Sequence, residues 1–472
     1  MCSIIGIYSR SNGDVSVYLS ALMDSLKHRG PEAFGIKTPK EEFKSKSFKQ
    51  LKFPKSPIAL GHCLLSTTGY GIQPLSKGNV SISHNGQIYN YKKLVKEQTM
   101  VSDSESIAYF FANELKKSSF ENALKKFMKK AEGEYAVGLF YKNSLYAFRD
   151  PIGLKPLWFG SNDSVFAFAS EPSALMKIDI QFPQPLLPGH MLKISKKGFE
   201  TKPIFNIENF KKTIPKKHSI KNLKSAFDET IQLQTKNLEK AAVLFSGGVD
   251  SSLIAKAVSQ KVPNTKLFVC GTKNSQDMVS AKEVAEELNL ELVSVEISEE
   301  KIKELMFRSM KILSFFDEMQ IGIAVTELAC ADAIVKHGYK VVFSGQGSDE
   351  IFCGYNNYAK ILKGQNYSAV EKEIWFSLSR IWSRNFYRDD AIIASNSLEL
   401  RVPLVSMQFL KQAMAIPAKE KIKNKEDKIR KWPIRELAKL YNISDSVALK
   451  PKKALQYGSG SQKIVSKILK GN

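Results

Sequence analysis

Short apolar runs alternate with polar and turn-forming clusters over the first part of the chain. The runs at 80–83 and 136–140 have the length of β-strands, and the stretches near 104–116 and 120–130 have a helical pattern. Strands that recur between turns, with a few helices among them, are typical of packed antiparallel sheets. The pattern predicts a domain of stacked antiparallel sheets flanked by helices over residues 2–205.

The pattern changes after a polar, lysine-rich stretch that contains Pro215. This stretch, residues 206–221, is expected to be a linker. Beyond it, apolar runs of strand length alternate with helical stretches such as 280–288 and 323–336. The expected strands lie near 241–245, 266–270, 291–296 and 340–344. This α/β alternation predicts a doubly wound parallel sheet over residues 222–472, so the chain combines an α+β domain with an α/β domain.

Composition agrees with two domains and with a cytoplasmic location. The chain has 472 residues, of which 43% are hydrophobic, and no apolar run is long enough to span a bilayer. The charged, glycine-containing start does not have the pattern of a secretory signal. The cysteines are too few and too scattered for a disulfide framework or a zinc site; they are Cys2, Cys63, Cys270, Cys330 and Cys353. We therefore expect a cytoplasmic protein with reduced thiols and no membrane partner.

The formal net charge of +23 raises the question of a nucleic-acid partner. Of the 70 basic residues ten are arginine, whereas nucleic-acid recognition favours arginine for bidentate and stacking contacts. No basic stripe interleaved with aromatic residues stands out. We expect solvated, lysine-rich faces and no nucleic-acid partner.

The most informative segment is a glycine turn that directly follows the apolar run 241–245. It reads Ser246-Gly247-Gly248-Val249-Asp250-Ser251-Ser252. The two glycines let the backbone approach an anion closely, and the serine hydroxyls and the N-terminus of the next helix donate to phosphate oxygens. Asp250 adds a hard oxygen ligand suited to Mg²⁺. No Gly-Lys-Ser/Thr follows, so this is not a Walker loop. The segment predicts a pyrophosphate-binding loop, the alternative being a turn without a ligand.

A second signal lies at the N-terminus. Removal of Met1 would leave Cys2 as the first residue, where its own α-amino group, with a pKa of about 7.7–8.0, can serve as a base for the thiol. An early cysteine alone is more often a buried structural thiol. Three further segments change that weighting, and they are 28–31 (HRGP), 85–90 (NGQIYN) and 102–105 (SDSE).

These segments resemble known families. The glycine turn resembles the SGGxDS loop of the ATP-pyrophosphatases, which implies that ATP is bound and split between its α and β phosphates. The N-terminal segments resemble the class II glutamine amidotransferases, which implies that Cys2 attacks the side-chain amide of glutamine and releases ammonia. By the same resemblance Asn85 and Gly86 form the oxyanion hole, and two uncharged donors suit thioester chemistry. The residues expected to bind glutamine are Arg29, Gln87 and Asp103.

Together the two halves resemble the glutamine-hydrolysing asparagine synthetases over nearly the whole chain. Further matches lie at 149–157, 343–350, 398–403 and 450–453. The resemblance implies that Asp349 joins Asp250 as a Mg²⁺ ligand and that Lys452 neutralises charge on the α-phosphate or the acyl-adenylate. The remaining residues expected around ATP are Leu244, Ser246, Gly247, Gly248, Ser251, Ser252, Cys270, Ser344 and Gly345, with Gln346 and Glu399 nearby. The small-molecule partners implied are glutamine and a carboxylic acid, aspartate by resemblance, and a homodimer is left open.

The departures from that family concern both substrates. Leu64 stands at the position of an arginine that grips the α-carboxylate of glutamine, and Gln87 replaces a glutamate, so we expect weaker glutamine binding. Gln346 replaces a loop glutamate proposed as a base, and an amide cannot take a proton. Segment 316–322 has two acidic residues and no cation, which predicts that aspartate is a poor acceptor. Two alternatives stay open: amidation of another acid, and a nucleotide-binding regulatory or RNA-associated protein without catalysis.

Overall fold

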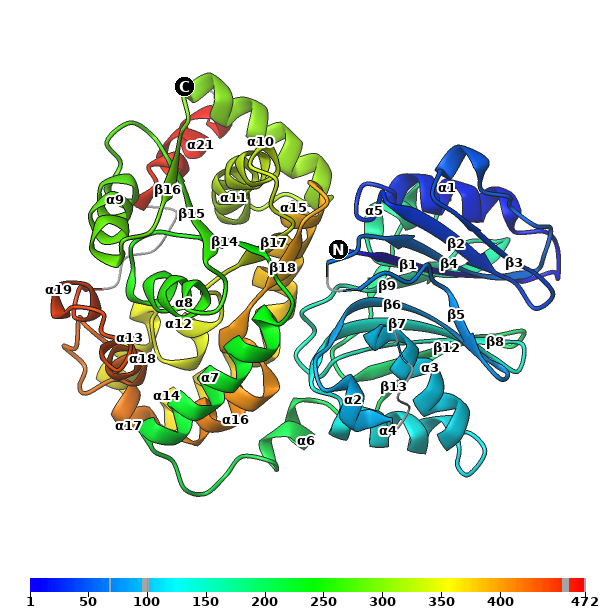
Figure 1. Cartoon of the computed structure of the whole chain (residues 1–472), viewed down its shortest axis with the longest axis horizontal. Coiled ribbons are helices and arrows are strands. Elements are labelled where there is room, and N and C mark those ends of the chain that lie inside the picture. Colours follow the sequence, from blue (N-terminus) through cyan, green and yellow to red (C-terminus); the bar gives the residue numbers. More distant parts are fainter. Residues whose placement is uncertain (68, 96–99, 101, 452–457, 471–472) are drawn as a thin grey trace. The chain divides into compact units, whose positions relative to one another are not determined.

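The structure is a computed structural model that describes residues 1–67, 69–95, 100, 102–451 and 458–470. The chain divides into two compact units, Met1–Lys212 and Thr213–Asn472 (Figure 1). The predicted fold class is confirmed, because the first unit is built on antiparallel sheets and the second on a parallel sheet. Among the described residues no helix is both long and apolar enough to cross a membrane.

The first unit contains two antiparallel sheets. One is formed by β1 (Ser3–Ser9), β2 (Ala33–Lys37), β3 (Glu42–Ser45), β4 (Ile58–Leu64), β9 (Trp158–Ser161), β10 (Val165–Ala169) and β11 (Gln184–Pro185). The other is formed by β5 (Leu75–Lys77), β6 (Val80–Ile88), β7 (Gly133–Tyr141), β8 (Ser144–Arg149), β12 (His190–Ser195) and β13 (Gly198–Pro203). Their strand orders are β11-β9-β10-β1-β4-β2-β3 and β13-β12-β8-β7-β6-β5.

Apolar side chains fill the space between these sheets. Ile4 and Phe168 of one sheet and Leu145 of the other belong to a single buried cluster. The outer face of the first sheet packs against α1 (Ser16–Leu26) and α5 (Pro172–Met176), and that of the second against α3 (Asp103–Glu114) and α4 (Phe120–Lys130). Because strands buried on both faces need apolar residues at successive positions, β1 and β4 read as near-continuous hydrophobic runs.

The second unit is a parallel sheet in the order β16-β15-β14-β17-β18. Its strands are β14 (Lys240–Leu244), β15 (Asn264–Gly271), β16 (Leu292–Glu296), β17 (Val341–Phe343) and β18 (Glu399–Arg401). The chain runs outward from β14 to β16 and then returns to the other side of β14 as β17. The loops after β14 and β17 therefore lie side by side at a topological switch point, where open α/β sheets bind ligands.

Helices cover this sheet and continue beyond it. They are α7 (Ile220–Thr235), α8 (Val249–Ser259), α9 (Gln276–Leu288), α10 (Glu299–Leu313), α11 (Glu318–Lys336), α12 (Ser348–Ile351), α13 (Asn356–Gly364), α14 (Tyr367–Ile381), α15 (Tyr387–Ala394), α16 (Met407–Ala415), α17 (Ala418–Lys421), α18 (Trp432–Lys439), α19 (Asp445–Ala448) and α21 (Ser461–Leu469). A single π-helical turn, Trp382–Phe386, joins α14 to α15. In Figure 1 these elements run from green to red.

Some expected boundaries differ from the structure. The strand β18 was not expected, since Glu399 and Arg401 leave it a single apolar residue, Leu400. Helix α11 begins at Glu318 instead of 323, because Asp317 caps it by accepting a hydrogen bond from the Gln320 backbone N–H at 2.9 Å. The segment 206–221 holds a short helix, α6 (Ile207–Lys211), and the first residues of α7.

Candidate functional site

Cys2 lies immediately before β1, a central strand of the first unit's seven-stranded sheet, and is partly buried. Its thiol donates to the Leu65 carbonyl oxygen at 3.6 Å, and its own carbonyl oxygen accepts from Arg29 Nε at 3.2 Å. The fully buried Arg29 guanidinium also donates to Glu171 at 2.8 Å. Burial raises the pKa of Glu171, but His28 and Arg29 outweigh it and hold the pKa at about 2. Arg29 thus anchors the backbone of Cys2, and contact with glutamine stays a prediction.

The Asn85 side chain is a buried polar group that could pair with a ligand. It lies on β6, its side chain is fully buried, and neither atom of its amide has a hydrogen-bond partner among the described residues. A buried amide without a hydrogen-bond partner destabilises the fold by about 1–3 kcal/mol, and a ligand that bonds to the amide removes this penalty. Gly86 follows with φ +138°, and a Cβ there would overlap the Glu134 carbonyl oxygen. Only glycine fits the second position of this pair.

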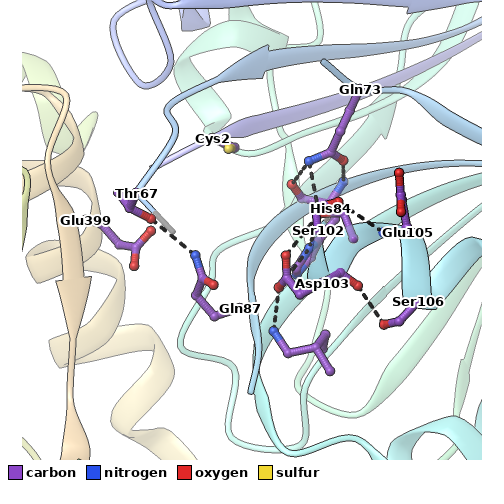
Figure 2. Close-up of polar contacts among 12 residues, drawn as sticks. Cys2, Thr67, Gln73, His84, Gln87, Ser102, Asp103, Glu105, Ser106 and Glu399 are labelled. Carbon is purple, nitrogen blue, oxygen red and sulfur yellow. Dashed lines mark hydrogen bonds and ion pairs between the residues drawn. The ribbon is translucent and has the colours of Figure 1, made fainter. Parts of the chain in front are cut away.

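A buried polar network holds the Asn85 strand against α3 (Figure 2). Gln73 Oε1 accepts from the His84 backbone N–H at 2.7 Å, and His84 Nδ1 lies 3.0 Å from Ser104 Oγ. Asp103, the first residue of α3, accepts from the Ile88 backbone N–H at 2.7 Å. The carboxylate of Asp103 is therefore fixed one strand position from Gln87.

Two other residues complete the description of this region. Gln87 Nε2 donates to Thr67 Oγ1 at 3.3 Å, while Leu64 is buried at the end of β4. His62 is fully buried, and its burial lowers its pKa to about 3. Since His62 is then neutral at physiological pH and hydrogen-bonded to the His84 carbonyl oxygen at 3.1 Å, it is a structural group and not the base for Cys2.

In the second unit the glycine turn joins β14 to α8. Gly247 has φ +67°, and a Cβ there would lie 2.6 Å from the Ser280 carbonyl oxygen. Gly248 caps α8, and the Ser251 hydroxyl donates to its carbonyl oxygen at 3.1 Å. The turn therefore presents the N-terminus of an eleven-residue helix at the carboxyl end of the sheet, as an anion-binding loop requires.

A buried lysine joins the two expected metal ligands. Lys431 Nζ lies 2.6 Å from Asp250 Oδ2 and 2.6 Å from Asp349 Oδ1, and its side chain is fully buried. Ser348 Oγ donates to the other oxygen of Asp250 at 2.6 Å. Two carboxylates beside a phosphate loop fit a Mg²⁺ ion that keeps most of its ligands from water and phosphate. No cluster of three or more acidic, histidine or cysteine side chains that could hold a metal by themselves occurs in the described ranges.

A cavity of about 760 Å³ opens above the turn, entirely within the second unit. Its lining includes most of the residues expected around ATP, namely Leu244, Ser246, Gly247, Gly248, Asp250, Ser251, Cys270, Ser344, Gly345, Gln346 and Asp349. Two expected residues lie elsewhere among those described. Ser252 is buried in α8, and Glu399 pairs with Arg401 at 2.7 Å on β18. Lys452 lies outside the described residues, but its neighbour Lys450 lines the cavity and donates to Ser280 Oγ at 2.7 Å.

Comparisons with known proteins match the two halves of the chain to two different families. The Asparagine synthase family matches residues 222–371 and 362–470, and the Glutamine amidotransferase domain matches residues 1–219. The chain belongs to the glutamine-hydrolysing asparagine synthetase family. A Methanocaldococcus jannaschii protein, provisionally named asparagine synthetase [glutamine-hydrolyzing] 1, is 30% identical over 100% of this chain and 96% of its own length. The asparagine synthetase of Brassica oleracea is 26% identical over 92% of this chain and 74% of its own.

The N-terminal half has a further relative of a different name. The amidophosphoribosyltransferase of Methanocaldococcus jannaschii is 34% identical over 224 residues, which are 41% of this chain and 47% of that protein. The N-terminal half is therefore similar both to part of an asparagine synthetase and to part of an amidophosphoribosyltransferase. Within the asparagine synthetase family, the identity of this chain's product depends on the cavity of the second unit.

The acidic residues of segment 316–322 have partners of their own, and the expectation that aspartate is a poor acceptor stays a prediction. Asp317 is the N-cap of α11, and the Glu318 carboxylate accepts from Gln462 at 3.3 Å. Neither acid of segment 316–322 is among the described residues that line the cavity, whereas four arginines do line it. Arg435 belongs to α18, and Arg380, Arg384 and Arg388 are spaced four residues apart through α14, the π-helical turn and α15.

Sequence reasoning missed these arginines and Lys431. The four-residue spacing of three of the arginines is a visible signal, since it places them on one helical face. No signal in the sequence distinguishes Lys431 from its many lysine neighbours. Its pairing with Asp250 and Asp349 joins positions far apart in the chain.

Proposed function

We propose that this chain makes an amide from a carboxylic acid, with glutamine as the nitrogen source and ATP as the activating agent. The acid is converted to an acyl-adenylate with release of pyrophosphate, and ammonia then displaces AMP. The observation that carries the proposal is the cavity in which the glycine turn lies beside Asp250, Lys431 and Asp349. A phosphate loop next to paired carboxylates suits cleavage of a polyphosphate.

The glutaminase half supplies ammonia. The Cys2 thiol would attack the side-chain amide of glutamine once Met1 is removed, with the α-amino group taking the thiol proton. The buried and unpaired amide of Asn85, together with Gly86, would donate to the oxyanion of the tetrahedral intermediate. Asp103 would hold the α-amino group of glutamine. The Arg29–Glu171 pair would keep the Cys2 backbone in position.

The synthetase half would bind ATP with its phosphates on the glycine turn. Asp250 and Asp349 would hold Mg²⁺, which supplies charge stabilisation to the polyphosphate when it is bound. Lys431 holds both carboxylates in place, because it pairs with each at 2.6 Å. Lys452 remains our expected partner of the α-phosphate or acyl-adenylate.

The arginines support an acceptor that carries a second negative charge. Arg388 is engaged by Glu327 and Asp389, whereas Arg380 and Arg384 are exposed residues of the cavity lining. A guanidinium is well suited to a carboxylate, because it can donate two parallel hydrogen bonds. We therefore propose a dicarboxylic acceptor, with aspartate as the first to test. The five free cysteines suit a reducing compartment such as the cytoplasm, and a homodimer remains a prediction.

ATP–pyrophosphate exchange tests this proposal. The purified chain is given ATP, Mg²⁺, labelled pyrophosphate and one acid from a panel that contains aspartate, glutamate, neutral amino acids and basic amino acids. We expect exchange that depends on an acidic acceptor and falls in Arg384→Gln through a raised KM for that acceptor. Exchange that prefers a neutral or basic acid would refute the dicarboxylate assignment, and the absence of exchange with any acid would refute adenylation.

A further inference from the structure

Gln346 leaves the synthetase half without an ionisable group at its position in the loop between β17 and α12. Its amide cannot accept a proton, yet amide formation must release one. The Gln346 side chain instead donates a hydrogen bond from Nε2 to Asp389 Oδ2 at 2.9 Å. Asp389 is buried at the start of α15, so the loop points directly to a buried carboxylate.

Asp389 and Glu327 of α11 both contact the guanidinium of Arg388. Glu327 is also buried, and it lines the cavity. The contact therefore joins two carboxyl groups from different helices, one of which faces the space where substrates would bind. Two buried carboxyl groups beside a single guanidinium favour a proton on one of them, since like charges at close range disfavour ionisation of both.

One cation is shared by this pair. Arg388 Nε lies 3.4 Å from Glu327 Oε2, and Arg388 Nη2 lies 2.5 Å from Asp389 Oδ1. Its remaining nitrogen, Nη1, donates to Gln320 Oε1 at 2.6 Å. One guanidinium balances one carboxylate, so the second carboxyl group is left to hold a proton.

The charge state agrees with that geometry. Burial raises the pKa of Glu327 well above its ordinary value, the negative charge of Asp389 raises it further, and Arg388 offsets part of the rise. Paired carboxyl groups whose proton is held in common are typical of acid–base sites. A single carboxylate would neutralise the buried charge of Arg388, whereas two carboxyl groups contact it.

We propose that the Glu327–Asp389 pair accepts the proton released when ammonia attacks the acyl-adenylate. This inference rests on the proposed function. The ammonia nitrogen bonds to the acyl carbon, and the bond from that carbon to the phosphate oxygen breaks to release AMP. One N–H proton passes to the pair through the Glu327 carboxyl group, which lines the cavity. Gln346 and Arg388 hold Asp389 in position, and the pair afterwards loses one proton to solvent.

The test separates the two half-reactions in the full-length chain. Glu327→Gln preserves size and hydrogen bonding but cannot take a proton. Acid-dependent ATP–pyrophosphate exchange should stay close to the wild-type rate, because adenylation does not need this base. Amide formation from ammonia should fall by about 10²- to 10⁴-fold, the usual contribution of a positioned base. Hydroxylamine, whose nitrogen is much less basic than ammonia and gives up its proton more readily, should recover much of the rate.

Two further variants complete the design. Glu327→Gln with Gln346→Glu returns a carboxylate to the loop and should regain amide formation. The matched control is Glu373→Gln, which removes a carboxylate that lines the same cavity and accepts a hydrogen bond from Ser377. The inference is overturned if Glu327→Gln forms amide at the wild-type rate, or if exchange and amide formation fall together. Failure of the proposed function would be seen separately, as a wild-type chain without acid-dependent exchange.

Discussion

Replacing Lys431 by methionine is the most informative single perturbation of the synthetase half. Methionine keeps the length of the side chain but removes the ammonium that lies 2.6 Å from both Asp250 and Asp349. Those carboxylates are mostly buried, with side-chain exposures of 14% and 15%. Without Lys431 the two carboxylates lose the cation that they share.

The structure sets the size of the effect on stability. Removing one partner of a buried ion pair typically costs about 3–5 kcal/mol, since the other charge is left buried. A loss of about 3 kcal/mol corresponds to a fall of roughly 6–12 °C in Tm for a domain of this size. We therefore expect the Tm of the second unit to fall by that amount in Lys431→Met when Mg²⁺ is absent.

Thermal unfolding followed by circular dichroism measures this prediction. The matched control is Lys439→Met, which breaks an exposed pair with Asp445 at 2.7 Å and should change Tm little. Lys431→Met with Asp250→Asn should recover part of the loss, because one unpaired charge is removed. Equal Tm values for Lys431→Met and Lys439→Met would refute the bridge that the account assigns to Lys431.

Three other predictions follow from the sites. Cys2→Ala should abolish ammonia release from glutamine but leave ammonia-dependent amide synthesis intact, and unchanged glutaminase activity would refute Cys2 as the nucleophile. Asp349→Asn should eliminate Mg²⁺-dependent pyrophosphate release in a phosphate assay, and ADP as a product would contradict the loop assignment. The pKa of Glu171 is lowered from 4.5 to about 2, so its stabilisation is present above about pH 4.5 and is lost as pH falls towards 2. The Tm difference between wild type and Glu171→Gln should therefore narrow on acidification, and a constant difference would count against the Arg29–Glu171 charge pair.

The fold class was predictable because each unit carries its own periodicity. Four strands of the second sheet stand out as apolar runs, whereas β18, which reads Glu-Leu-Arg, has a single apolar residue. Helix α11 was shortened in the prediction because its first turn is polar. The position of Asp317 as its N-cap explains the early start.

The candidate site was predictable where its chemistry is local. The glycine turn and Asn85–Gly86 are short segments whose residue types require particular backbone shapes. Lys431 could not be assigned, because its role depends on contacts between distant parts of the chain, whereas the spacing of Arg380, Arg384 and Arg388 was visible and was missed. The acidic residues of segment 316–322 have partners on α11 and α21 and do not line the cavity.

The most direct test of the central claim follows the nitrogen and the phosphates in one reaction. The full-length chain is incubated with Mg²⁺, ATP, aspartate and glutamine labelled with ¹⁵N in its side-chain amide, and the products are identified by mass spectrometry. We expect a ¹⁵N-labelled amide of the acceptor, formed together with equal amounts of AMP and pyrophosphate. An unlabelled product, or ADP and phosphate in place of AMP and pyrophosphate, would contradict this expectation.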